Sequence, residues 1–264
     1  MKQIHGGIVI NDATVNCLLY ADDLALISDS EEHMQELLNV VSSWSRKWRI
    51  KFNQAKSKVV HFRKSIVPRS NFMFQLCSEN IEIVEQYKYL GSMLHESLDF
   101  QITANVLAKS AQRAMGAVTH KYRQLNGLSY TTYTTLFNSC VATILDYGAE
   151  VWGYKDFTKI DTVQQNAIRV FLGLHKFAPV DGFAGDMGWT QARVRRHVAM
   201  VRFWNRMISM DDDRLTKKIF LYDLSLLHNN WSSEMKCILE SIDERECFDN
   251  LHICSIHTVW PKLH

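Results

Sequence analysis

Two adjacent carboxylates, Asp22 and Asp23, lie between two apolar runs in the stretch LLYADDLALIS at 18–28. Apolar segments of this kind enter a protein core, so we expect a semi-buried environment for the aspartates. Two like charges stay ionised in such a place only when a cation lies between them. Mg²⁺ is held by carboxylates and substrate phosphates and serves phosphoryl transfer. Because Asp also favours turn positions, a plain hairpin turn is the alternative interpretation.

The residues after this stretch predict an amphipathic helix over 31–48. Ser28 and Ser30 precede Glu31-Glu32, a pattern typical of a helix start. Apolar residues then recur at helical spacing and predict one buried stripe. The stripe consists of Leu37, Leu38, Val41, Trp44 and Trp48.

Short strands are predicted in the rest of the first hundred residues. A turn at Asn11-Asp12 joins the first two strands, and Ser78-Glu79-Asn80 joins the last two. The predicted strands are Ile8–Ile10, Val15–Leu19, 57–62, 72–76 and 81–84.

From about residue 100 the apolar spacing is helical, so we place a boundary there between an α+β region and an all-helical region. Four amphipathic helices are predicted; Ser129 is the N-cap of the second, and the third ends near Gly173. Their buried faces contain, in order, Leu107, Ala111, Met115 and Val118; Leu136, Cys140, Val141 and Ile144; Ile160, Val163, Ala167, Ile168 and Phe171; and Val194, Val198, Val201 and Met207. A last helical stretch is predicted from Met235 to Ile242.

The formal net charge of +2 conceals long basic stretches without acids. Nine bases and no acid lie between Glu36 and Glu79, and acids are absent again between Asp99 and Asp146. Such stretches are the footprint expected of phosphate contacts, and a solvated surface is the alternative. The bases are Arg46, Lys47, Arg49, Lys51, Lys56, Lys58, Arg63, Lys64 and Arg69 in the first stretch, Lys109, Arg113, Lys121 and Arg123 in the second, and Arg193, Arg195, Arg196, Arg202 and Arg206 in a third cluster.

Composition narrows the class of protein. A hydrophobic fraction of 47% and only three prolines indicate an ordered chain. Without a signal-peptide pattern or a long apolar run, we expect an intracellular protein, cytoplasmic or nuclear, that is neither secreted nor membrane-spanning. The six cysteines show no framework and are predicted to be reduced thiols. A zinc site at Cys237, Cys247, His252 and Cys254 is an alternative that their spacing does not favour.

Three spaced stretches resemble reverse transcriptases of non-LTR (LINE-type) retrotransposons, and they occur in the order of that family. They are LLYADDLALIS at 18–28, WSRKWRIKFNQAKSKVVHF at 44–62 and EQYKYLGSML at 85–94. The resemblance is to the C-terminal half of the polymerase core. It continues into the region after that core through LDYGAEVWG at 145–153, VQQNAIRVFLGLHKFAP at 163–179 and GDMGW at 185–189.

The resemblance implies an α+β fold. A remnant of a polymerase palm, with the antiparallel YADD hairpin and a helix, would be followed by a mostly α-helical, thumb-like and C-terminal region. The implied domains are a partial palm with its primer-grip turn at 1–100, a helical thumb- or connection-like region at 101–225 and a tail at 226–264.

The resemblance also implies roles for single residues. Asp22 and Asp23 would be catalytic ligands of Mg²⁺, and Lys56 would lie behind the active site as a general acid toward pyrophosphate. For Lys56 a simple phosphate contact and a plain surface lysine remain open, as does a core position for Tyr20. The implied partners are an RNA template and a DNA primer. The residues implied to contact nucleic acid are Tyr20, Ala21, Lys58, Arg63 and the primer-grip residues Tyr89, Leu90 and Gly91.

The family's third metal-binding carboxylate comes from a strand well before the YADD hairpin. Only nineteen residues precede Tyr20 here, and Asp12 is their single acid. We therefore expect an N-terminally truncated enzyme with half a ligand set, weak or absent Mg²⁺ binding and no polymerisation by this chain alone. A non-catalytic nucleic-acid-binding remnant and an inert retroelement relic are the alternatives.

Overall fold

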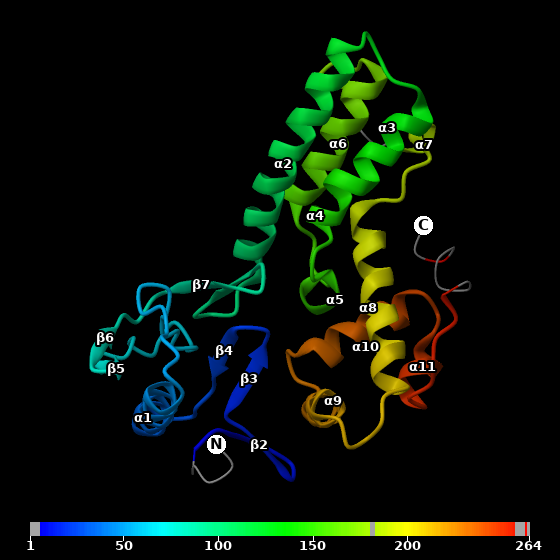
Figure 1. The fold of residues 1–264 in the computed structure, drawn as a ribbon. Coiled ribbons are helices and arrows are strands. Elements are labelled where there is room, and N and C mark those ends of the chain that lie inside the picture. The colour runs from blue at the N-terminus through cyan, green and yellow to red at the C-terminus, as the bar shows by residue number, and fades with distance from the viewer. Residues whose placement is uncertain (1–5, 180–182, 257–261, 263–264) are drawn as a thin grey trace. The chain divides into compact units, whose positions relative to one another are not determined.

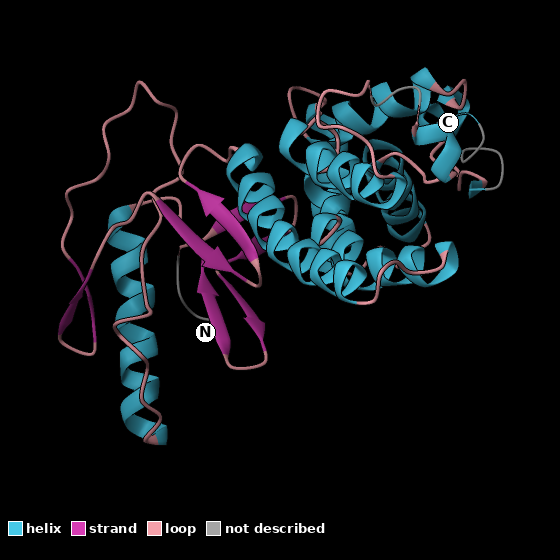
Figure 2. Cartoon of the chain, turned by 90° about the horizontal axis from the view of Figure 1, so that it is seen from above, coloured by secondary structure: helices cyan, strands magenta, loops and turns pink. Residues whose placement is uncertain are grey.

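The computed structural model describes residues 6–179, 183–256 and 262. The architecture is α+β, and the chain forms two compact units (Figures 1 and 2). All strands of the described residues lie in the first of them, which we call the hairpin unit. The hairpin unit comprises Met1–Asp99 and Asp212–Tyr222. The helical unit comprises Phe100–Asp211 and Asp223–His264. In the hairpin unit, Lys218 Nζ bonds Asp12 Oδ2 at 2.8 Å and so ties the second segment to the first turn.

The strands form four separate antiparallel hairpins rather than one sheet. The turn at Asn11-Asp12 is confirmed, but the predicted strand Val15–Leu19 is divided between two hairpins. The pairs are β1 (Ile8–Ile10) with β2 (Ala13–Val15), β3 (Cys17–Tyr20) with β4 (Asp23–Leu26), β5 (Phe74–Leu76) with β6 (Glu79–Ile81), and β7 (Gln86–Tyr89) with β8 (Ser92–His95).

The predicted strand at 57–62 is wrong. Only Val59 forms a bridge, to Ile83. Its N–H donates to Glu82 O and its carbonyl accepts from Val84 N, so the two segments touch at a single point and no ladder continues.

Helix α1 (Glu31–Trp48) begins as predicted, with the Ser30 side chain accepting from His33 N at 3.2 Å. Its predicted stripe is wrong at its end, because Trp44 is 43% exposed and Trp48 is 60% exposed. The helix packs there against the turn that follows β5, and Ser42 Oγ accepts from Cys77 N at 2.9 Å.

The core of the hairpin unit lies between α1 and the β5–β6 hairpin. Leu24 and Leu26 of β4 pack against this core, so the β3–β4 hairpin is held by one face. The buried members of the cluster are Leu38, Val41, Phe74, Leu76 and Ile81.

In the helical unit α2 (Phe100–Gln124) packs along α6 (Thr158–Leu172) (Figure 1). The buried faces predicted for these two helices are confirmed, except that Phe171 is half-buried. The other elements of the described chain are α3 (Tyr130–Phe137), the π-helix η1 (Asn138–Ala142), α4 (Thr143–Leu145), α5 (Ala149–Trp152), α7 (Ala184–Met187), α8 (Ala192–Ile208), α9 (Leu215–Leu226), α10 (Trp231–Ser241) and α11 (Arg245–Asp249).

The second predicted helix contains an irregularity that the sequence did not reveal. Ser129 caps α3, with its Oγ accepting from Thr132 N at 3.2 Å, as predicted. The π-helix η1 then follows and turns Cys140 to the surface while Val141 stays fully buried. A π-turn adds a residue to the helical repeat and therefore shifts which side chains face the core.

Candidate active site and nucleic-acid interface

Asp22 and Asp23 lie at the tip of the β3–β4 hairpin. Tyr20 pairs with Asp23 across the strands, which leaves Ala21 and Asp22 as a two-residue turn. Ala21 has a φ of 51° and Asp22 a negative φ, the sign pattern of a type II′ turn. Alanine in the left-handed region costs about 1 kcal/mol, and glycine is the usual residue there. The sequence therefore accepts backbone strain where the two acids meet.

The two sides of this hairpin differ in environment. Side chains alternate along a strand, so Asp23 and its partner Tyr20 share the face opposite to Leu24 and Leu26, which pack on the core. Tyr20 is 64% exposed, so its interpretation as a core aromatic is wrong.

Both aspartates are exposed, so the expected semi-buried environment is also wrong. The described residues place no third strand beside β3 or β4. Like charges repel weakly in water, so the exposure of both side chains removes the argument that a cation must lie between them.

The turn offers only part of a metal site. Among the described residues no group of three or more His, Cys, Asp or Glu side chains could hold a metal ion. The zinc alternative at Cys237, Cys247, His252 and Cys254 therefore finds no support. Asp22 and Asp23 are oxygen ligands of the type that Mg²⁺ takes, and they would fill a minority of its six positions.

The predicted primer-grip residues form a second tight turn, between β7 and β8. Tyr89 pairs with Ser92, and the residues between them, Leu90 and Gly91, have φ values of 45° and 87°. Two positive φ values define a type I′ turn, which matches the twist of a hairpin. Glycine adopts this conformation freely, whereas a leucine in it is strained.

A cluster of ion pairs closes the other end of the β7–β8 hairpin. Glu96 accepts from Arg69 Nε at 2.7 Å and from Arg63 at 2.5 Å, and Arg63 N donates to the Glu96 carbonyl. These hydrogen bonds, from Arg69 first and then from Arg63, lower the pKa of Glu96 to about 2 although burial opposes them. Nothing in the spacing of Arg63, Arg69 and Glu96 along the chain predicts that they meet.

Lys56 and Lys58 have different surroundings. The Lys56 carbonyl accepts from the Tyr87 hydroxyl at 2.7 Å, which ties its loop to β7. The Lys56 side chain is exposed and, within the described residues, bonds neither aspartate of the turn. Lys58 Nζ instead pairs with Glu82 at 2.9 Å, so its charge is offset.

The remaining bases of the first stretch divide in the same way. Arg63 pairs with Glu96, and Arg69 pairs with both Glu96 and Glu85. Apart from Lys58, the other bases of this stretch are exposed and have no acidic partner among the described residues, so its free positive charge lies on Arg46, Lys47, Arg49, Lys51, Lys56 and Lys64.

The two basic regions of the helical unit also differ from each other. Helix α2 contains no acid, and Lys109, Arg113, Lys121 and Arg123 are exposed on it. In the third cluster three arginines on α8 pair with aspartates, at 3.3, 2.7 and 3.6 Å for Arg193–Asp156, Arg195–Asp146 and Arg196–Asp161. This part of the third cluster is thus an internal ion-pair network.

Arg196 is the most unusual member of that network, because it is fully buried. Burial lowers the pKa of its guanidinium and raises the pKa of Asp161. Its Nε has no hydrogen-bond partner, and the group lies over the Phe157 ring at 5.5 Å.

No helix of the described chain is long and apolar enough to cross a membrane.

Comparisons with known proteins point to one family. Residues 2–94 match the family described as reverse transcriptase (RNA-dependent DNA polymerase). A probable RNA-directed DNA polymerase from transposon BS of Drosophila melanogaster is 23% identical over 159 residues, which cover 57% of this chain and 18% of that protein. The RNA-directed DNA polymerase from mobile element jockey of the same organism is 24% identical over 175 residues, covering 62% and 19%. No solved structure matches.

The chain thus spans about a fifth of the length of the curated relatives it matches. The family match includes both tight turns, the one with Asp22-Asp23 and the one with Leu90-Gly91. Residues 2–94 are thus similar to reverse transcriptases, and both relatives are RNA-directed DNA polymerases of transposable elements.

Proposed function

We propose that the hairpin unit is a palm-like element of an RNA-directed DNA polymerase and that Asp22 and Asp23 contribute ligands to its Mg²⁺ site. The observation that carries the proposal is the β3–β4 turn, which presents two exposed carboxylates and Tyr20 at one hairpin tip. In this proposal the helical unit corresponds to a thumb-like region, and RNA template and DNA primer are the partners.

The residues of the turn have separate tasks in this proposal. Asp22 and Asp23 hold the metal through their carboxylate oxygens, and Tyr20, on the face of Asp23, lies beside the primer end. Bound Mg²⁺ supplies positive charge to the phosphate and to the attacking hydroxyl. Lys56 is exposed and its side chain has no partner in the described part of the chain, so it is available as a phosphate contact or a proton donor to pyrophosphate.

The same geometry supports a limit on activity. Two carboxylates without a third ligand nearby make a weak and loosely oriented metal site. We therefore propose that the 264-residue chain alone binds nucleic acid but does not extend a primer. Non-catalytic binding of nucleic acid is the second candidate function. It is favoured by the exposed lysine and arginine side chains that have no acidic partner among the described residues.

Primer extension on an RNA template with Mg²⁺ tests the metal assignment, using the chain beside its Asp22→Asn variant. We expect no extension by either, and weak Mn²⁺ binding in a paramagnetic titration that the variant loses. Extension by the wild type alone would contradict the proposal that the metal site is incomplete, but it would support Asp22 as a metal ligand. Extension that survives Asp22→Asn, or Mn²⁺ binding unchanged in it, would overturn the ligand assignment.

RNA binding tests the basic surface. Replacing Arg49, Lys51 and Lys56 together by alanine should weaken binding and lower the slope of log K against log salt by about 2 to 3, since each phosphate contact contributes about 0.9. The matched control replaces Lys155, Lys159 and Lys176, which are exposed bases of the helical unit outside both stretches. Equal losses in the two triple variants would show that only net charge matters and would overturn the proposed surface.

A further inference from the structure

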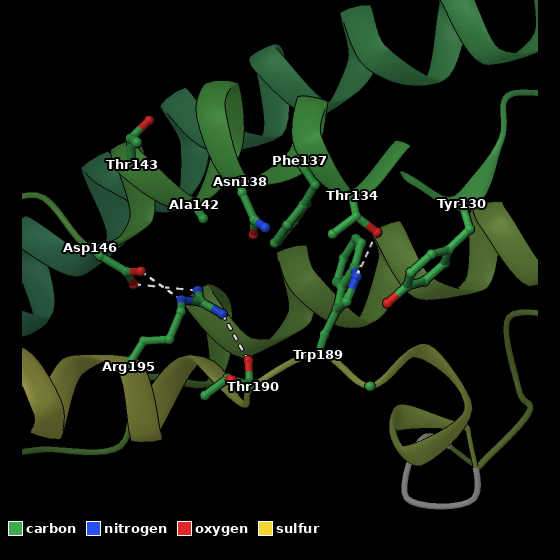
Figure 3. A pocket seen from close by; sticks show the side chains of 11 residues that line it. Tyr130, Thr134, Phe137, Asn138, Ala142, Thr143, Asp146, Trp189, Thr190 and Arg195 are labelled. Atoms are coloured by element: carbon green, nitrogen blue, oxygen red, sulfur yellow. Dashed lines mark hydrogen bonds and ion pairs between the residues drawn. The ribbon is translucent and has the colours of Figure 1, made fainter. Parts of the chain in front are cut away.

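The helical unit contains an open cavity of about 610 Å³ that the proposed polymerase site does not involve, and Arg195 is the one lining residue that belongs to the basic clusters (Figure 3). It lies between the α3–η1–α4 segment and the start of α8. A volume of this size is typical of sites for small ligands. All of its lining residues belong to one compact unit, so its shape is fixed within that unit.

One wall of the cavity is aromatic and held in place by several contacts. The rings of Phe137 and Trp189 stack with centroids 4.1 Å apart. Trp189 Nε1 donates to Thr134 Oγ1 at 3.1 Å (Figure 3). The Tyr130 hydroxyl donates to Met187 O at 2.6 Å. Phe137 is only 1% exposed and supports Trp189 from behind, so a planar ligand would meet the rings of Trp189 and Tyr130. Both rings are held in place, so the entropic cost of this contact would be small.

At the other end of the cavity the charges of Arg195 and Asp146 offset each other. Arg195 bonds both carboxylate oxygens of Asp146, at 2.7 and 3.4 Å, and its third nitrogen donates to Gln164 and to the Thr190 carbonyl. With four of its five N–H groups used and its charge offset by Asp146, this guanidinium has less attraction left for a phosphate. The cavity therefore favours an uncharged ligand.

Asn138 supplies the free hydrogen-bonding group. It begins the π-helix η1, and Figure 3 shows its side chain directed between Phe137 and Arg195. Within the described residues its amide has no hydrogen-bond partner, so it offers one donor and one acceptor side by side. π-helical turns frequently occur at functional sites, because they redirect a side chain.

We propose that this cavity binds a single unstacked nucleobase, with adenine preferred, which lies against the aromatic wall and is hydrogen-bonded at its edge by Asn138. An asparagine amide matches adenine in particular, since it accepts from N6 and donates to N7. Aromatic stacking contributes comparably for every base, so the preference must come from the amide. The base is either that of a free nucleoside or one of a single strand; only the strand-borne source rests on the proposed function.

The test is a titration of the 264-residue chain with adenosine and with cytidine, in which calorimetry or saturation-transfer NMR measures binding. Asn138→Asp keeps the shape of the side chain but removes its donor, and it should weaken adenosine binding about tenfold, the value of one good base contact. Asn166→Asp makes the same change on an exposed position of α6 outside the cavity and should have no effect. Tyr130→Leu is a second variant at the exposed rim, and it should weaken both nucleosides.

Adenosine is uncharged, so its binding should not change with salt, unlike the binding of RNA by the basic surface. The triple variant of Arg49, Lys51 and Lys56 should keep adenosine binding even where it loses RNA. A preference for oligo(A) over oligo(U) that Asn138→Asp abolishes would identify a strand as the source, and adenosine binding without that preference a free nucleoside. Absence of saturable adenosine binding, or binding equal in the wild type and Asn138→Asp, would overturn the proposal.

Discussion

The hairpin unit and the helical unit are stabilised in different ways. The helical unit surrounds one continuous cluster that includes Tyr133, Phe137 and Trp152, each at most 1% exposed. In the hairpin unit four separate hairpins are tied to α1 and to loops by a small cluster and by single polar contacts. The proposed catalytic residues lie on strained, exposed turns of the hairpin unit. Turns of this type are positioned by a few contacts, so small changes should move them.

Two tryptophans should give the largest contrast between the units. Trp152 is 1% exposed, its Nε1 donates to Tyr147 O, and its ring meets Phe157 edge-on. Trp152→Ala should lower the free energy of unfolding by about 3–5 kcal/mol, because it leaves a large cavity. Trp48→Ala removes a ring that is 60% exposed and should change stability by less than about 0.5 kcal/mol. Urea unfolding followed by circular dichroism measures both.

Equal losses for the two tryptophans would contradict the comparison, since they would show that Trp48 is covered in solution. A loss for Trp152→Ala that is seen only by probes of the helical unit would sharpen it. The two units would then unfold independently.

A buried histidine should make the helical unit sensitive to acid. Burial, and then the charges of Arg193 and Arg196, lower the pKa of His197 to about 4. The unfolded chain therefore takes up a proton below about pH 6.5 that the folded chain refuses, so stability falls as the pH drops from about 6.5 to about 4, by up to about 3 kcal/mol.

Thermal unfolding between pH 7 and pH 4 tests this expectation against two matched variants. His197→Gln should flatten the pH dependence of the melting temperature, while His120→Gln, at an exposed position of α2, should leave it unchanged. A wild-type curve parallel to that of His197→Gln would contradict the assignment.

Adjacent serines on α1 test the polar ties of the hairpin unit. Ser42 and Ser43 each donate to the carbonyl four residues earlier, at 2.7 and 2.9 Å. Only Ser42 also accepts from Cys77 N. Ser42→Ala should therefore cost about 1–3 kcal/mol, the penalty of an unsatisfied N–H group, and Ser43→Ala less than about 0.5 kcal/mol. Hydrogen exchange at the Cys77 amide should accelerate in the first variant alone; equal effects in both would contradict the tie.

Local patterns in the sequence predicted the helices well. Spacing of apolar residues gives the faces of α2 and α6, and capping residues give the starts of α1 and α3. Such signals are local, because each is contained within a few turns of one helix. The same spacing placed Trp44 and Trp48 on the buried stripe, but both are exposed, because spacing alone does not show where the packing partner of a helix ends.

In the candidate sites, too, features encoded by neighbouring residues were predicted, and contacts between distant residues were not. The order of the motifs located the Asp22-Asp23 turn and the Leu90-Gly91 turn, whose geometry follows from neighbouring residues. The Arg63–Glu96 ion pair joins residues 33 apart in the sequence, and the Arg195–Asp146 pair joins residues 49 apart. No local pattern encodes such contacts. The π-turn at Asn138, which lines the cavity, had no sequence signal.

The smallest expected effect concerns the strain of the β7–β8 turn, and it separates stability from function there. Asn-Gly is the preferred type I′ pair, so Leu90→Asn should stabilise the hairpin unit by about 0.5–1 kcal/mol. Gly91→Ala, at a φ of 87°, should destabilise it by about 1 kcal/mol. If leucine is retained because it contacts primer or template, Leu90→Asn should also bind RNA less well than the wild type while being more stable. A more stable variant with unchanged RNA affinity would show that Leu90 has no part in binding, and it would leave the strain of this turn without a functional reason.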